Sequence, residues 1–255
     1  MDVKASTIYV VDGDTGSGRL ESERRFTHVP LKELPLDKLP EDAFAILNLQ
    51  GEERQQVLGA FFRQKRPFAL GGIGGVTKDE LMRLCETAHR KKARAWVIGG
   101  YRMLPIVAAV KEVITGGCLG ELKSLSVHGD YGIDLAQDTL LVDATIWMCR
   151  EKPRGNSSII PSMKFERDSK RLGIVACGSA GGLEAACDLS EGRGWMKTIV
   201  NGHQCTRTFW GIDTVAMELN LLASLVPVGV GILPGVVPLA ELTSAFNLLQ
   251  LENGR

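Results

Sequence analysis

The chain has 255 residues, and its 30 Lys and Arg residues balance 30 Asp and Glu residues. An apolar fraction of 44% and a charged fraction of 24% are typical of a globular protein and exclude a disordered or coiled-coil chain. Proteins that bind nucleic acid usually carry a basic surplus, so the zero net charge argues against a nucleic-acid partner. The six cysteines form no close pairs and no basic-then-apolar leader is found, so we expect a reducing, cytoplasmic location.

Membrane and metal binding are also not expected. The long uncharged stretch over residues 221–240 contains three prolines and three glycines, which would interrupt a membrane helix repeatedly. The four histidines show no spacing typical of metal ligands, so we predict no metal site.

The first part of the chain alternates strand-like and helix-like segments. Thr77 followed by Glu80 forms a capping box, which predicts the start of a helix that runs to about residue 92. The alternation predicts a parallel sheet flanked by helices, that is, an incomplete Rossmann-like α/β domain over residues 1–100. The predicted elements are strands at 7–11, 42–49, 67–70 and 95–98 and helices at 52–63 and 77–92.

The second part, residues 101–255, has a different pattern. Pro105 opens a helix, and residues 121–212 contain mostly alternating runs that are typical of antiparallel strands with one packed face. Two further helices are predicted near 213–225 and 239–251, which makes this an α+β domain with an open, mainly antiparallel sheet. Some strands are apolar on both faces, so we expect a homo-oligomer, most simply a dimer, formed through this sheet.

The segment that joins the two predicted domains carries a family resemblance. Arg102 and Pro105, followed by Gly117 and Gly120, are spaced as in the Gfo/Idh/MocA oxidoreductases. In that family, an Arg-x-x-Pro helix start is followed by a Gly-x-x-Gly turn into the second domain. The resemblance implies a Rossmann domain that binds NAD(P), a second domain that dimerises through its open sheet, and catalysis by a Lys from a Glu-Lys-Pro motif together with an Asp and a His.

The cofactor-binding part of the family pattern is incomplete. Residues 42–46 resemble the family's fourth Rossmann strand, and Ile8 then lies at about the distance of the second strand. The first strand and its Gly-x-Gly-x-x-Gly turn would precede Met1. Asp12 is a candidate for the acidic residue that holds the adenosine ribose, or simply a turn residue. As an alternative, the glycine-rich segment 13–18 follows a strand and forms a substitute phosphate loop.

The catalytic part of the pattern is also altered. The Glu-Lys-Pro motif falls on Gly71, Gly72 and Ile73, and no glycine can donate a proton. These glycines either cradle a phosphate of the cofactor or replace a lost active-site segment. Asp143 matches the family's Asp, whereas the position of the His is occupied by Trp147.

These residues leave two functions open. With the glycine loop, the Lys and the His missing, we expect a non-catalytic relative that acts in binding, in regulation or as a partner subunit, with no cofactor. The alternative is an active NAD(P)-dependent oxidoreductase on a sugar or cyclic polyol, with Asp143, Arg102 and either His128 or Tyr131 in its active site. Arg102 either holds a small polar ligand at the domain junction or pairs with a carboxylate. Asp143 is otherwise a helix cap, and Trp147 either stacks on a sugar or fills the core.

Overall fold

The computed structural model divides into two compact units, described here one at a time. Unit 1 comprises residues 1–99 and 218–247, and unit 2 comprises residues 100–217 and 248–255. The structure describes residues 8–12, 26–30, 43–49, 51–71, 73, 76–98, 100–130, 135–149, 162–166, 171–214, 217, 221, 236–245 and 247.

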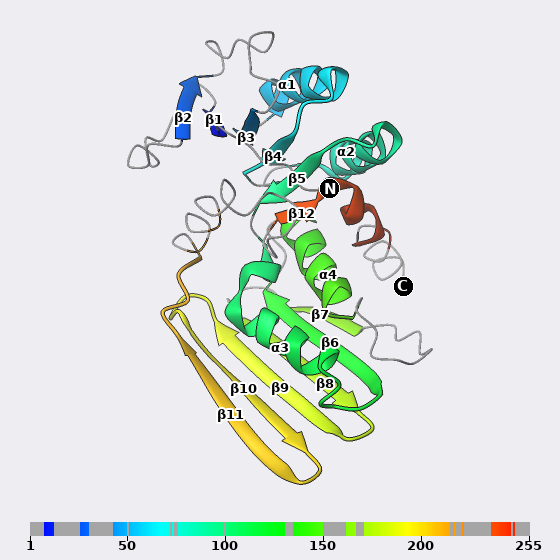
Figure 1. The fold of residues 1–255 in the computed structure, drawn as a ribbon, viewed down its shortest axis with the longest axis vertical. Helices are drawn as coiled ribbons and strands as arrows, with labels where there is room; N and C mark the ends of the chain where they lie inside the picture. Colours follow the sequence, from blue (N-terminus) through cyan, green and yellow to red (C-terminus); the bar gives the residue numbers. More distant parts are fainter. Residues whose placement is uncertain are drawn as a thin grey trace. The chain divides into compact units, whose positions relative to one another are not determined.

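Unit 1 is built around a six-stranded sheet with the order β12-β5-β4-β3-β1-β2 (Figure 1). The first five strands in the sequence are parallel to their neighbours, and β12 runs antiparallel to β5. This confirms the predicted parallel sheet. The strands are β1 (Ile8–Asp12), β2 (Phe26–Pro30), β3 (Phe44–Asn48), β4 (Phe68–Leu70), β5 (Ala95–Ile98) and β12 (Val236–Pro238).

Two helices return the chain between the central strands of this sheet. Helix α1 (Gly51–Gln64) connects β3 to β4, and α2 (Lys78–Lys91) connects β4 to β5. The hydroxyl oxygen of Thr77 accepts a hydrogen bond from the backbone N–H of Glu80 at 3.3 Å, so the predicted cap is confirmed. Both helices are followed by a lysine in the left-handed region, Lys65 at φ 55° and Lys92 at φ 49°.

Unit 2 contains a second six-stranded sheet with the order β11-β10-β9-β8-β6-β7 (Figure 1). All neighbouring strands are antiparallel except β6 and β7, which confirms the predicted open, mainly antiparallel sheet. Its elements are the short helix η3 (Tyr101–Met103), α3 (Pro105–Thr115), β6 (Leu122–Asp130), α4 (Leu135–Cys149), β7 (Ser162–Glu166), β8 (Arg171–Gly178), β9 (Gly181–Asp188), β10 (Arg193–Val200) and β11 (His203–Trp210).

The two faces of this sheet differ in burial. Along β8, Leu172, Ile174 and Ala176 are buried in a core shared with α3 and α4, whereas the residues between them point to the opposite face. We call that opposite side the open face. It carries four partly exposed apolar side chains: Val175 at 39%, Trp195 at 37%, Ile199 at 43% and Trp210 at 73% exposure.

Helix α4 is the largest departure from the predicted elements, because its residues were assigned to the region of alternating strands. Leu140, Leu141, Val142 and Ala144 are all buried, so apolar residues occupy most of its circumference. A helix of this kind shows no clear period of 3.6 residues in the sequence.

The closing segment also differs from the prediction, which assigned residues 101–255 to one domain. Residues 218–247 belong to unit 1, because β12 pairs with β5 and the short helix η4 (Leu239–Glu241) packs on α2. Within the described part of the chain, no helix is both long enough and apolar enough to span a membrane.

Candidate functional site

The most heavily buried charged groups of unit 2 form one ion pair. Asp143 accepts hydrogen bonds from Arg102 at both carboxylate oxygens, at 2.6 Å from Nε and 2.5 Å from Nη2. Arg102 is 5% exposed and Asp143 is 2% exposed. The pairing is the bidentate geometry that the planar guanidinium favours.

The backbone on each side of the pair explains this geometry. Gly100 has φ 87°, and a Cβ there would also contact Leu140 of α4, so glycine is required where the chain enters η3. Pro105 then starts α3 at its first turn, where proline is tolerated best. Arg102 is therefore held in η3 between a tight turn and a helix start, facing α4.

Trp147 lies one turn after Asp143 on α4 and completes the cluster. The guanidinium carbon of Arg102 is 5.6 Å from the centroid of its ring, and Nζ of Lys111 is 4.0 Å from it. Because residues four apart share one face of a helix, Asp143 and Trp147 lie on the same side of α4, and Arg102 contacts both of them. Trp147 is also packed against the unit 2 core. Lys111 was not singled out in the sequence, because a helical lysine alone gives no such signal.

This arrangement limits what Asp143 can do chemically. The residue lies inside α4, so it does not cap that helix. Both of its oxygens accept from Arg102, and almost none of its surface reaches solvent. A general base must come within hydrogen-bond distance of the proton it takes. In this geometry the carboxylate anchors η3 to α4.

His128, the other described candidate acid, does not join this cluster. Its neighbour Val127 is buried in the core with α3 and α4, so the alternation of β6 directs His128 to the open face of the sheet. There its Nε2 lies 3.1 Å from the hydroxyl of Ser126. Tyr131 and Gly72 lie outside the described residues.

In unit 1, the predicted cofactor-binding positions gather at the carboxyl ends of the strands. The chain runs from β1 to β2 on one side and then returns to β3 on the other side of β1, which creates a topological switch point. Ligands of open α/β sheets bind at such a point. Asp12 is in register with Asn48 there, and Gly71 follows β4 with its N–H donated to Leu47 at 3.1 Å.

The side chain of Asn48 lies close against Gly71. A Cβ at this position would overlap the side-chain oxygen of Asn48. Because β1 pairs directly with β3, the sheet has no strand between them. This direct pairing is compatible with both interpretations of the sequence. In one, β1 is the second strand of the family pattern; in the other, β1 is the first strand and the glycine-rich segment 13–18 follows it. The segment lies outside the described residues.

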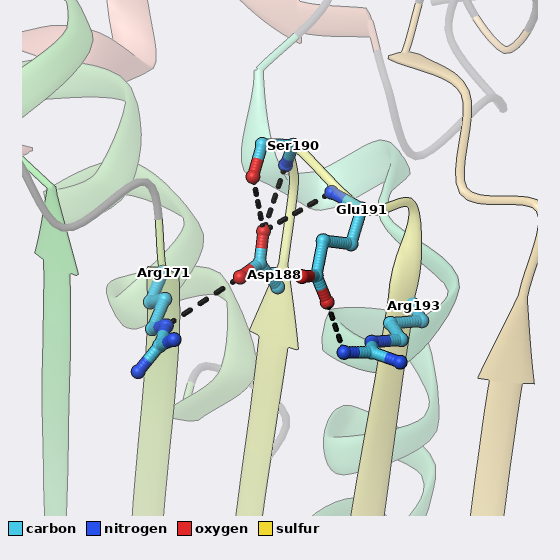
Figure 2. Close-up of polar contacts among 5 residues, drawn as sticks. All are labelled: Arg171, Asp188, Ser190, Glu191 and Arg193. Atoms are coloured by element: carbon cyan, nitrogen blue, oxygen red, sulfur yellow. Dashed lines mark hydrogen bonds and ion pairs between the residues drawn. The ribbon is translucent and has the colours of Figure 1, made fainter.

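A second polar cluster, which was not predicted, lies at one end of the open face (Figure 2). Asp188 accepts from the hydroxyl of Ser190 at 2.6 Å, from two backbone N–H groups of the following turn, and from Nε of Arg171 at 3.4 Å. These bonds, led by the one from the Ser190 hydroxyl, lower the pKa of Asp188. Arg193 pairs with Glu191 across the same turn. A hollow of about 320 Å³ beside them is lined by Trp195 and Trp210.

The described residues offer neither a metal site nor an activated thiol. No group of three or more His, Cys, Asp or Glu side chains in them is arranged to hold a metal ion. Burial raises the pKa of Cys85 to about 12 and the pKa of Cys149 and Cys187 to about 11. Such thiols stay protonated at neutral pH and are poor nucleophiles.

Comparison with known proteins identifies the fold. No protein-family model matches the sequence, and no curated protein matches it. Solved structures do match. A protein assigned as an oxidoreductase from Bacteroides fragilis has a TM-score of 0.66 at 12% identity, over 98% of this chain and 97% of that chain.

Two further structures show the same likeness. The aldose-aldose oxidoreductase from Caulobacter crescentus, complexed with glycerol, has a TM-score of 0.64 at 11% identity and covers 98% of both chains. The transcriptional regulator Gal80p from Kluyveromyces lactis has a TM-score of 0.63 at 12% identity, over 99% of this chain and 91% of that chain. At such identities the likeness establishes the fold, and function must be argued from the site. The chain has the fold of the Gfo/Idh/MocA-type oxidoreductases, the family that its sequence motifs resemble.

Proposed function

We propose that this protein uses an oxidoreductase fold without catalysing hydride transfer and acts in binding, in regulation or as a partner subunit. The observation that carries the proposal is the buried ion pair. Asp143 stands at the position of a catalytic Asp in the family pattern, yet both of its oxygens are held by Arg102. A carboxylate in this state is a structural anchor.

The other positions of the family pattern support the same conclusion. Gly71 and Gly72 stand where the pattern has Glu and Lys, and Trp147 stands where it has His. An indole is no proton shuttle, and a glycine has no side chain to supply. Loss of one acid or base group typically costs about 10²–10⁴ in rate, and here two are absent from their positions. The likeness to Gal80p shows that a transcriptional regulator can have this fold.

NAD(P), the cofactor that the resemblance implies, finds only part of a site among the described residues. Asp12, Asn48 and Gly71 lie at the carboxyl ends of strands at the switch point, which is the place for a dinucleotide. This placement favours the alternative function, an active NAD(P)-dependent oxidoreductase on a sugar or cyclic polyol. Gly71 has no side chain, and neither Asp12 nor Asn48 is the Lys or the His that the family pattern uses for proton transfer.

A turnover assay on the purified full chain tests the proposal, and titration with NADH and with NADPH first establishes whether nucleotide binds. Nucleotide fluorescence reports binding, and a bound nucleotide at about 100 times its Kd would stabilise the fold by about 2.7 kcal/mol. The same protein is then supplied with NAD⁺ or NADP⁺ and a panel of aldoses and cyclic polyols. We expect no turnover, whether or not the nucleotide binds.

Turnover would overturn the proposal, provided that it depends on this chain's own side chains. The variants that establish this dependence are His128→Gln and Tyr131→Phe, which remove the acids of the alternative function. A third variant, Lys123→Gln, changes an exposed residue of β6 and serves as the matched control.

The open face of unit 2 supports a second element of the proposal, self-association of the chain. Val175, Trp195, Ile199 and Trp210 all lie on this face, which α3 and α4 leave uncovered. Apolar patches of this kind on a sheet mark protein interfaces. We propose that a second copy of the chain covers it, and the oligomeric state in solution is the test.

A further inference from the structure

The helix ends at the amino edge of the unit 1 sheet are strongly basic. Segments 63–66 and 89–94 contain seven of the chain's 30 Lys and Arg residues and no Asp or Glu. We call these seven residues the basic patch: Arg63, Lys65, Arg66, Arg90, Lys91, Lys92 and Arg94.

The topology of unit 1 brings the two segments together. Helix α1 leads into β4 and α2 leads into β5, each through a connection of three residues, and β4 and β5 are adjacent and parallel (Figure 1). The backbone N–H of Phe68 donates to the carbonyl of Arg94 at 3.0 Å, so the two connections lie side by side. Neighbouring strands are about 4.8 Å apart. The cations therefore form one surface.

Five of the seven cations of the basic patch point into solvent. Arg63, Lys65, Arg90, Lys91 and Lys92 are exposed. Among the described residues, Glu86 lies one turn before Arg90 on α2, and Glu241 lies in η4, which packs on α2.

Helix capping accounts for only a part of this charge. The carboxyl end of a helix carries about half a negative charge, so two helices offset about one of seven positive charges. Lys65 and Lys92 also occupy left-handed positions, at φ 55° and 49°, where glycine is the residue with least strain. Two lysines in such positions keep cations at the patch where the backbone alone would favour glycine.

We propose that the basic patch binds an acidic segment of a partner protein. The chain as a whole is neutral, so the rest of it has 23 basic against 30 acidic residues. An extended polyanion such as duplex DNA or an anionic bilayer would meet this acidic remainder beyond the patch. A short acidic segment meets the patch alone. This inference is independent of whether the chain is catalytic.

The composition of the patch argues against single-stranded nucleic acid and against insertion into a bilayer. None of the large exposed apolar side chains of the described residues lies in segments 63–66 or 89–94. Base stacking on single strands and insertion into a bilayer both need aromatic or apolar side chains at the contact. Electrostatic attraction to carboxylates needs only the cations, and it weakens with salt because the Debye length falls to about 8 Å at about 0.15 M.

Fluorescence anisotropy of the full chain with a labelled peptide of alternating glutamate and serine tests the proposal. A peptide with glutamine in place of glutamate is the control ligand, and duplex DNA and phosphatidylserine vesicles are the competing probes. We expect the acidic peptide to bind, more weakly as salt increases, and the other three probes not to bind at physiological salt.

Two patch variants and one matched control locate the site. An exposed ion pair changes affinity by a factor of about 1.4 to 5, so Arg90→Glu/Lys91→Glu should lower it about tenfold, because reversal replaces attraction with repulsion. Lys123→Glu/Arg207→Glu reverses two exposed cations of unit 2 and should leave affinity within about twofold.

Lys65→Gly/Lys92→Gly separates binding from folding. Glycine relieves the left-handed strain, so the melting temperature should hold or rise while affinity falls about fivefold. The proposal is overturned if the acidic peptide does not bind, if DNA or vesicles bind in its place, if both reversal variants weaken binding equally, or if Lys65→Gly/Lys92→Gly leaves affinity unchanged.

Discussion

The change Asp143→Asn removes one charge of the buried pair and leaves the other in place. Arg102, 5% exposed, would keep its positive charge without a carboxylate to neutralise it. Breaking a buried ion pair from one side typically costs about 3–5 kcal/mol. In a chain of this size, each kcal/mol lowers Tm by about 2–4 °C, so we expect a fall of about 6–20 °C. Arg102→Met should be similarly destabilising, because it removes the guanidinium from which both buried oxygens of Asp143 accept.

Removing both charges together should restore most of the lost stability. In Arg102→Met/Asp143→Leu, apolar side chains fill a similar volume, and such replacements of buried pairs are often neutral or stabilising. Urea unfolding followed by tryptophan fluorescence measures all three variants, since Trp147 lies beside Arg102 and reports on unit 2. Single variants that each cost less than about 1 kcal/mol would refute the reasoning, because that is the range of an exposed pair. So would a double variant as unstable as the sum of the two.

Three further predictions concern other parts of the chain. The pKa of Asp188 is lowered, first by the Ser190 hydroxyl, below its ordinary value of 3.8. The ionised carboxylate of Asp188 therefore stabilises the fold above that value, and this stabilisation is lost as the pH falls through the pKa of the folded state. Urea unfolding at a series of pH values from neutral to about 2 should show this fall in the free energy of unfolding, and Asp188→Asn should lack it. Trp210→Glu should shift the self-associated protein to monomer in light scattering, and an unchanged mass would contradict the proposed interface. A thiol reagent at pH about 8 should label only the exposed cysteines of the native protein, with mass spectrometry as the readout. These are Cys118, Cys177 and Cys205.

Local sequence signals were sufficient for most of unit 1. The predicted strand at 95–98 coincides with β5, and the strand predicted at 42–49 contains β3. These strands are buried on both faces, so each is a short apolar run between turn residues. The cap at Thr77 was equally readable, since both of its partners lie within three residues. Strand β2 (Phe26–Pro30) was not predicted, because a run with Thr, His and a terminal Pro has little apolar signal.

The candidate site could be predicted only in its parts. Arg102 and Asp143 were both singled out, and a carboxylate partner for Arg102 was one of two alternatives. Their pairing joins positions 41 residues apart, and it depends on α4, which was not recognised as a helix. The contact of Lys111 with Trp147 depends on the same helix. Contacts of this range are set by tertiary packing, which periodicity in one segment does not encode.

The place of β12 in its sheet has a consequence for biosynthesis. Unit 2 draws most of its residues from one continuous stretch, 100–217, so a nascent chain can form most of it before residues 236–238 are made. Unit 1 recruits its edge strand from residues 236–238, more than 130 positions after β5. During synthesis, the side of β5 that β12 will cover has unpaired backbone groups until residues 236–238 leave the ribosome, and a chaperone would be of most use during that interval.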